Sequence, residues 1–122
     1  MNIDPSSGSI LNAVLNKSVN ILFDDRILTE YREVLKRPKF QFFDDYIETL
    51  LEFLEFEGVY VVAGPTSATL PDSDDLPFYE VAVAGGADYL VTENDRHFPV
   101  DRMVVSPRAF LDILREIEES TR

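Results

Sequence analysis

The sequence has no cysteine and no tryptophan, and it contains a single histidine, His97. Without cysteine, a disulfide framework and a thiolate metal site are excluded. No apolar run approaches the roughly 18 residues that a membrane span needs. The opening residues MNIDPSSGS have neither a basic stretch nor an apolar one, so no signal peptide is expected. We therefore expect a cytoplasmic protein that does not enter a membrane.

Positive charge is also scarce, because 11 Lys and Arg stand against 23 Asp and Glu, for a net charge of −12. Such a surface repels nucleic-acid phosphate at long range, which argues against a simple DNA-binding module. It suits a cation-loaded site or a basic protein partner, and it is equally typical of an ordinary soluble surface. No strand pattern leads into GxGxxG or GxxxxGK[ST], so a nucleotide-binding loop is not expected. The acid arrangement of a receiver domain is not seen either.

What the chain does contain is an alternation of helix and strand patterns over 122 residues, which is enough for one domain with its own core. Apolar spacing predicts helices over residues 9–16, 25–37, 44–56, 76–84 and 106–119. Short apolar runs predict strands over 19–23, 59–63, 88–92 and 103–105. Residues 64–71 are predicted as a loop, and 95–101 as a loop or a short helical turn. Strands that alternate with helices favour a parallel sheet covered on both faces, hence a single α/β domain.

Two of the predicted helices have distinct side-chain patterns. The helix over 44–56 is amphipathic, and its predicted inward side chains are Tyr46, Ile47, Leu50, Leu51, Phe53 and Leu54. The helix over 25–37 ends before Pro38 in a basic cluster of Lys36, Arg37 and Lys39. The dipole of that helix is by itself a sufficient reason for cations at its C-terminal end.

Acidic and polar side chains gather around the helix over 76–84 and the strand over 88–92. They are Asp72, Asp74 and Asp75 before the helix and Thr92, Asn94 and Asp95 after the strand. Acids at a helix start and polar groups just past the carboxyl end of a strand face the same crevice of an α/β protein. Carboxylate and amide oxygens are ligands that Mg²⁺ and Mn²⁺ prefer. The pattern predicts a metal site, and Glu30, flanked by inward positions, is a further candidate.

Each of these candidates also has a purely structural interpretation. The aspartates before the helix are good helix caps and complement its dipole. Asn94 is typical of a turn. His97 has the chemistry of a general base, but no serine or cysteine nucleophile motif accompanies it. We interpret it as a loop histidine that is either packed or exposed.

Four stretches of the chain together resemble a known family. They are ILFDDRILTEYREVLKRPKF (21–40), DSDDLPFYEVAVAGGADYLVTEN (72–94), RHFP (96–99) and SPRAFLDIL (106–114). These resemble the PIN-domain family, in the branch of toxin components of toxin–antitoxin pairs. The resemblance covers most of the chain from about Ser7 onward. It implies a three-layer α/β/α fold with a parallel sheet, and a Mg²⁺- or Mn²⁺-dependent single-strand endoribonuclease activity.

The resemblance also assigns roles by position. Glu30 and Asp75 correspond to catalytic, metal-binding acids, with Asp72 and Asp74 as assisting metal ligands. Asn94 stands where the family has an aspartate or an asparagine, and Thr92 is its strand-end hydroxyl residue. The best candidates for contacts with the RNA backbone are the basic residues Lys36, Arg37, Lys39, Arg96 and Arg102.

One departure from the family pattern concerns the start of the chain. The family's first β-strand and its aspartate have no counterpart, and Asp4 follows no apolar run that would place it in that role. The resemblance therefore implies an N-terminally truncated domain over residues 1–122. We expect impaired metal binding and catalysis, and a sheet with a gap or exposed apolar edges that favour a homo-oligomer.

The sequence thus predicts a PIN-like ribonuclease of the toxin type, impaired by the missing aspartate, whose substrate is RNA. The alternative is a non-catalytic module whose open apolar surface pairs with an antitoxin or with a second copy of the chain. Retention of Glu30 and Asp75 favours the enzyme, and absence of the first aspartate favours the binding module.

Overall fold

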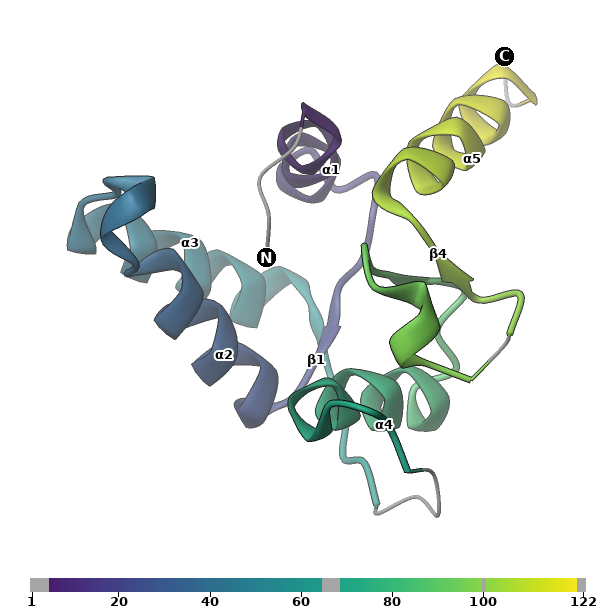
Figure 1. The fold of residues 1–122 in the computed structure, drawn as a ribbon. Helices are drawn as coiled ribbons and strands as arrows, with labels where there is room; N and C mark the ends of the chain where they lie inside the picture. Colours follow the sequence, from purple (N-terminus) through teal and green to yellow (C-terminus); the bar gives the residue numbers. More distant parts are fainter. Residues whose placement is uncertain (1–4, 65–68, 100, 121–122) are drawn as a thin grey trace.

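The structure is a computed structural model that describes residues 5–64, 69–99 and 101–120 (Figure 1). Asp4 and residues 65–68 of the predicted loop lie outside these ranges. The described helices and strands are, in order, α1 (Pro5–Leu15), β1 (Leu22–Phe23), α2 (Asp25–Leu35), η1 (Pro38–Phe40), α3 (Asp44–Glu57), β2 (Val59–Tyr60), η2 (Ser73–Asp75), α4 (Leu76–Ala84), β3 (Leu90–Val91), η3 (Asp95–His97), β4 (Val104–Val105) and α5 (Pro107–Ser120). None of these helices is long and apolar enough to cross a membrane.

The strands form two separate parallel pairs. β1 lies beside β2 with Leu22 opposite Val59, and β3 lies beside β4 with Leu90 opposite Val104. Within the described ranges no strand pairing joins the two. Helices alternating with parallel strands confirm the predicted α/β class, but the expected single sheet is present as two pairs. Each strand is also shorter than its predicted apolar run, because only part of each run pairs with a neighbour.

Helix boundaries follow the local chemistry of the sequence. Asp24 begins α2, where its Oδ1 accepts a hydrogen bond from the backbone N–H of Ile27 at 3.1 Å. Ser106 begins α5 in the same way, since its Oγ accepts from the N–H of Ala109 at 3.1 Å. α4 has the predicted bounds, and α1 starts earlier than predicted, at Pro5.

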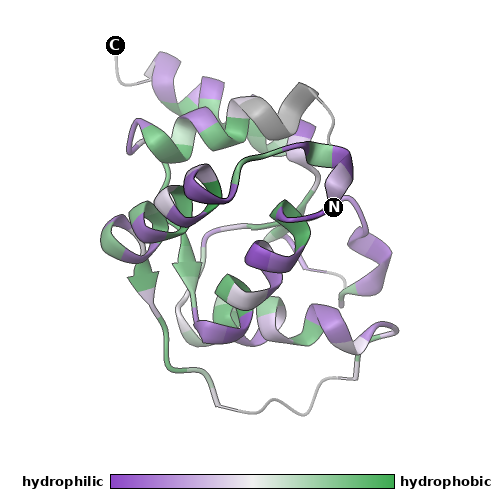
Figure 2. Cartoon of the chain, turned by 90° about the vertical axis from the view of Figure 1, so that its left-hand side faces the viewer, coloured by the Kyte–Doolittle hydropathy of each residue, from purple (hydrophilic) through white to green (hydrophobic). Residues whose placement is uncertain are grey.

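The core consists of two apolar clusters that meet at α4. Ile27 and Ile47 lie in the larger cluster, and Leu90 lies in the smaller one. α4 packs against both β1 and β3, so it connects the two strand pairs. The strands are hydrophobic, whereas the helices carry both hydrophobic and hydrophilic residues (Figure 2). One prediction was wrong, because Tyr46 does not point inward and is 46% exposed.

Candidate metal centre

A short helical turn before α4 fixes two aspartates. The Oδ1 atom of Asp72 accepts a hydrogen bond from the N–H of Asp74 at 2.9 Å, and its carbonyl oxygen accepts from the N–H of Asp75 at 3.1 Å. Pro77 then occupies the first turn of α4, where a missing N–H costs nothing. Both carboxylates therefore lie at the N-terminal end of α4, where the helix dipole favours negative charge.

His97 is held by a separate set of hydrogen bonds that starts at β3. The N–H of Thr92 donates to the carbonyl oxygen of Val105 at 2.9 Å, which continues the β3–β4 pairing. The Oγ1 of Thr92 accepts from the N–H of Asn94 at 3.0 Å. The carbonyl oxygen of Asn94 in turn accepts from the N–H of His97 at 2.9 Å. Thr92 and Asn94 thus shape the η3 turn that carries the histidine.

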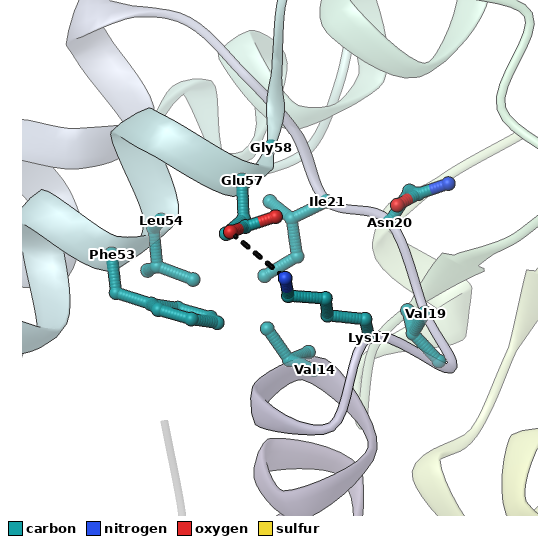
Figure 3. Close-up of a pocket in the computed structure, with 9 residues that line it drawn as sticks. All are labelled: Val14, Lys17, Val19, Asn20, Ile21, Phe53, Leu54, Glu57 and Gly58. Atoms are coloured by element: carbon teal, nitrogen blue, oxygen red, sulfur yellow. Dashed lines mark ion pairs between the residues drawn. The ribbon is translucent and has the colours of Figure 1, made fainter.

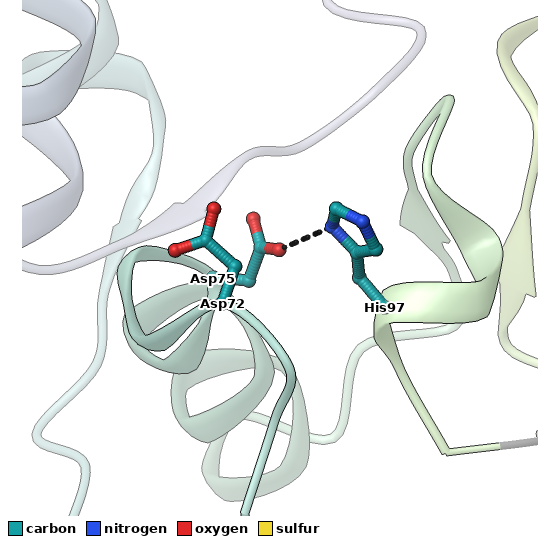
Figure 4. Close-up of side chains that lie close together, drawn as sticks. All are labelled: Asp72, Asp75 and His97. Atoms are coloured by element: carbon teal, nitrogen blue, oxygen red, sulfur yellow. Dashed lines mark hydrogen bonds and ion pairs between the residues drawn. The ribbon is translucent and has the colours of Figure 1, made fainter.

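These two elements bring Asp72, Asp75 and His97 together (Figure 4). Nδ1 of His97 lies 3.1 Å from Oδ2 of Asp75, and one ligand atom from each of the three residues lies within 4.8 Å of the others. Asp72 is exposed, while Asp75 and His97 are half-buried, so the group opens to solvent. Two carboxylates and an imidazole form a donor set that fits a divalent cation such as Mn²⁺.

The other predicted ligands lie outside this three-residue group. Glu30 is half-buried on α2, next to Tyr31, whose ring centroid is 6.0 Å from that of Phe78 on α4. Glu30 therefore lies on a helix that packs beside α4. Asp74 and Asn94 are exposed. In the described chain, Asp74 supplies a backbone N–H to the aspartate turn and Asn94 supplies backbone groups to the histidine turn.

The predicted RNA-contacting cations divide into two groups. Arg96 is exposed beside His97 in η3, and Arg102 is exposed shortly before β4. The exposed residues Lys36, Arg37 and Lys39 lie at the other end of α2, where the chain turns toward α3. Arg96 is therefore the cation next in sequence to the candidate metal centre.

A second charged group, which the sequence argument missed, joins α2 to α4. Arg26 donates from Nε to Oδ2 of Asp24 at 2.9 Å and from Nη1 to Oε1 of Glu80 at 2.7 Å. The two acids are only 7% and 5% exposed. The hydrogen bond between Arg26 and Asp24 raises the pKa of Arg26, and the hydrogen bond with Glu80 raises it further. Since both carboxylates bind the guanidinium, this group connects two helices and does not offer an open ligand set.

A small hollow between α1 and the end of α3 is a weaker candidate for a functional site than the metal centre. Val14, Ile21 and Phe53 are among its lining residues (Figure 3). Its charged side chains, Lys17 and Glu57, bind each other with 3.3 Å between Nζ and Oε1. The hollow is therefore mainly a packing feature with an ion pair at its edge.

Comparison with known proteins identifies a family. A family model described as PIN domain matches residues 2–96, which is more than half of the chain. Neither the curated proteins nor the solved structures contain a significant match. The matched range includes the aspartate turn, α4 and Thr92, Asn94 and Arg96, and it ends one residue before His97.

Proposed function

The chain belongs to the PIN-domain family, and from this premise we propose that it is a divalent-metal-dependent single-strand ribonuclease of the toxin type that acts in the cytoplasm. Membership of the family is compatible with a nuclease or with a protein-binding module. The observation that favours the nuclease is the convergence of Asp72, Asp75 and His97 at the start of α4. A structural ion pair accounts for Asp75 and His97, whereas Asp72 adds a second carboxylate whose ligand atom lies within 4.8 Å of theirs.

In this proposal Asp72 and Asp75 hold Mg²⁺ or Mn²⁺ through carboxylate oxygens, and His97 adds its Nδ1. Glu30, Asp74 and Asn94 are proposed to assist at the same site. A bound divalent cation supplies charge stabilisation to a phosphodiester and lowers the pKa of a water molecule. Oδ2 of Asp75 lies 3.1 Å from Nδ1 of His97, close enough for one cation to replace this hydrogen bond and bind both atoms. Arg96 contributes a positive charge for a phosphate oxygen beside the site.

Titration calorimetry with Mn²⁺ tests the proposal when it is paired with cleavage of an end-labelled single-stranded RNA. The parent chain is expected to bind Mn²⁺ and to cleave the RNA at a low rate, because the set of metal ligands is sparse, and EDTA is expected to stop the cleavage. The double variant Asp72→Asn/Asp75→Asn is expected to lose both properties. A matched control is Asp44→Asn/Asp45→Asn, which neutralises two exposed acids in the first turn of α3. Absence of Mn²⁺ binding in the parent, or equal loss in the control, would reject the site.

The strand pairs support a second candidate function, in which the chain binds an antitoxin or a second copy of itself. In the described structure β2 pairs with β1 only, and its side chains are open: Val59 is 49% exposed and Tyr60 is 52% exposed. Val62, just beyond the strand, is 88% exposed. An open apolar strand edge favours pairing with another chain. Light scattering should then show an oligomer that Val62→Lys dissociates, and a monomeric parent would contradict self-pairing.

A further inference from the structure

Four aromatic residues lie close together in the sequence at the tip of the α2–α3 hairpin, and we refer to Phe40, Phe42, Phe43 and Tyr46 as the tip platform. The rings of Phe40 and Phe42 are stacked, with centroids 5.9 Å apart and planes 14° apart. Tyr46 continues the series, since its ring centroid lies 5.4 Å from that of Phe42 at an interplanar angle of 35°. Three rings of the tip platform, those of Phe40, Phe42 and Tyr46, therefore form a row.

The rings are placed by the local backbone and not by the core. Gln41 has a φ of 54°, a left-handed conformation between Phe40 and Phe42 that turns the chain sharply after η1. None of the four rings belongs to the two apolar clusters of the described structure. Phe42 is 39% exposed and Phe43 is 84% exposed. Apolar side chains that gather on the surface instead of the core mark a binding site.

The charges around the tip platform indicate what it binds. Lys36, Arg37 and Lys39 provide three of the 11 basic residues within four positions of a chain whose net charge is −12. Nζ of Lys39 lies 5.0 Å from the ring centroid of Phe40. Within the described residues, Lys36 is the one of these three cations that forms an ion pair, and its Nζ lies 3.9 Å from Oε1 of Glu48. The acids nearest in sequence to the rings of the tip platform are Asp44 and Asp45, at the start of α3.

We propose that the tip platform stacks on the bases of single-stranded RNA while Lys36, Arg37 and Lys39 contact the phosphates. Exposed rings combined with flanking cations are the means by which proteins bind single strands without reading sequence. A duplex offers no base faces to such rings. Asp44 and Asp45, which follow Phe43, repel phosphates and so limit the affinity of the platform for any nucleic-acid strand. Stacking on the rings then makes strands whose bases are free the preferred ligands.

The position of the platform suits the ribonuclease proposed above, on which the choice of RNA rests. Tyr31 contacts Phe78 of α4, three residues after Asp75. From Tyr31 the helix rises about 1.5 Å per residue, so Lys36, just past the end of α2, lies about 7.5 Å further along the helix axis. Figure 1 shows the hairpin of α2 and α3 extending away from α4. A strand held at the tip could therefore extend along α2 toward the candidate metal centre.

Binding in EDTA tests the platform separately from catalysis. Fluorescence anisotropy compares a labelled oligouridylate with an abasic strand of equal length and charge. The parent is expected to bind the base-bearing strand more tightly. Phe42→Leu/Tyr46→Leu is expected to weaken that binding by about tenfold and to leave abasic binding unchanged, since these two rings supply stacking that only a base can use. An oligothymidylate should behave like the RNA, because stacking tolerates either sugar.

The matched control is Phe56→Leu, which removes an 86% exposed ring at the other end of α3 and should leave all affinities unchanged. Circular dichroism confirms that each variant folds. Asp72→Asn/Asp75→Asn should also bind normally in EDTA, so a failed metal centre and a failed platform give different results. Equal parent affinity for both strands would overturn the proposal. So would an oligomer that the double ring variant dissociates while strand binding is absent, because the rings would then form a protein contact.

Discussion

Arg26 of α2 and Glu80 of α4 are joined by a contact of 2.7 Å between Nη1 and Oε1. The same guanidinium also holds Asp24, the residue that begins α2. One cation therefore fixes both the start of α2 and its position against α4. Since α4 follows Asp75 directly and α2 carries Glu30, this ion pair sets the relative placement of two predicted ligand-bearing elements.

Removal of the guanidinium should lower stability. We expect Arg26→Met to reduce the free energy of unfolding by about 1–3 kcal/mol, because two nearly buried carboxylates each lose a charged hydrogen-bond donor. Urea denaturation followed by circular dichroism measures the change. Arg32→Met is the matched control, since Arg32 pairs with Glu48 at the surface and should matter little. The double variant Arg26→Met/Glu80→Met should recover part of the lost free energy of unfolding. A double variant that is less stable than Arg26→Met would contradict this account.

The histidine of the metal centre should affect metal preference. Imidazole suits Mn²⁺ and Zn²⁺ better than Mg²⁺, which prefers oxygen ligands. We expect His97→Gln to weaken Mn²⁺ binding by at least about tenfold and to change Mg²⁺ binding much less. Titration calorimetry gives both affinities. Pulsed electron paramagnetic resonance of the Mn²⁺ complex should show a nitrogen coupling that the variant lacks, and a parent spectrum without nitrogen coupling would rule out ligation by His97.

Tyr31 should make stability fall at alkaline pH. Its burial raises its pKa to about 12, against about 10 in an unfolded chain. Between these values the unfolded chain has lost the phenolic proton and the folded chain has kept it. The contribution of Tyr31 to the free energy of unfolding is therefore complete below pH 10 and is lost as the pH rises toward 12. Urea denaturation at pH 9 and pH 11 should show a smaller decline for Tyr31→Phe than for the parent, whereas exposed Tyr46→Phe should decline as the parent does.

Gly58 should tolerate no side chain. A Cβ atom there would lie 2.7 Å from the carbonyl oxygen of Leu54 and 2.8 Å from that of Ile21. Backbone atoms on both sides leave no room for adjustment, so we expect Gly58→Ala to destabilise the fold by about 1–3 kcal/mol. Gly64→Ala is the control, because no atom of the described chain beyond its immediate neighbours lies within 4 Å of its Cβ position. Equal melting temperatures of the two variants would show that the α3–β2 junction is looser than described.

Sequence reasoning succeeded where the determinants are local. α4 could be predicted with its observed bounds because an acid-rich turn, Pro77 and Gly85 mark its ends within a few residues. The apolar runs predicted strands longer than those observed, since an apolar run does not show how many of its residues pair with a neighbouring strand. The aspartates of the metal centre follow from the helix start. The contact of His97 with Asp75 spans 22 positions, and that of Arg26 with Glu80 spans 54, so no local pattern could reveal either.

Two neighbouring residues of α4 belong to different cores, because Val81 lies in the larger apolar cluster and Ala82 in the smaller one. This helix of nine residues therefore joins the two strand pairs, and the packing of α1 against α5 joins the two sides of the fold a second time. Loosening of α4 would disturb both cores at once, whereas loosening of either strand pair would leave the other intact. In hydrogen exchange, the amides of α4 should consequently open only with global unfolding, and those of β3 and β4 should open earlier as a unit of their own.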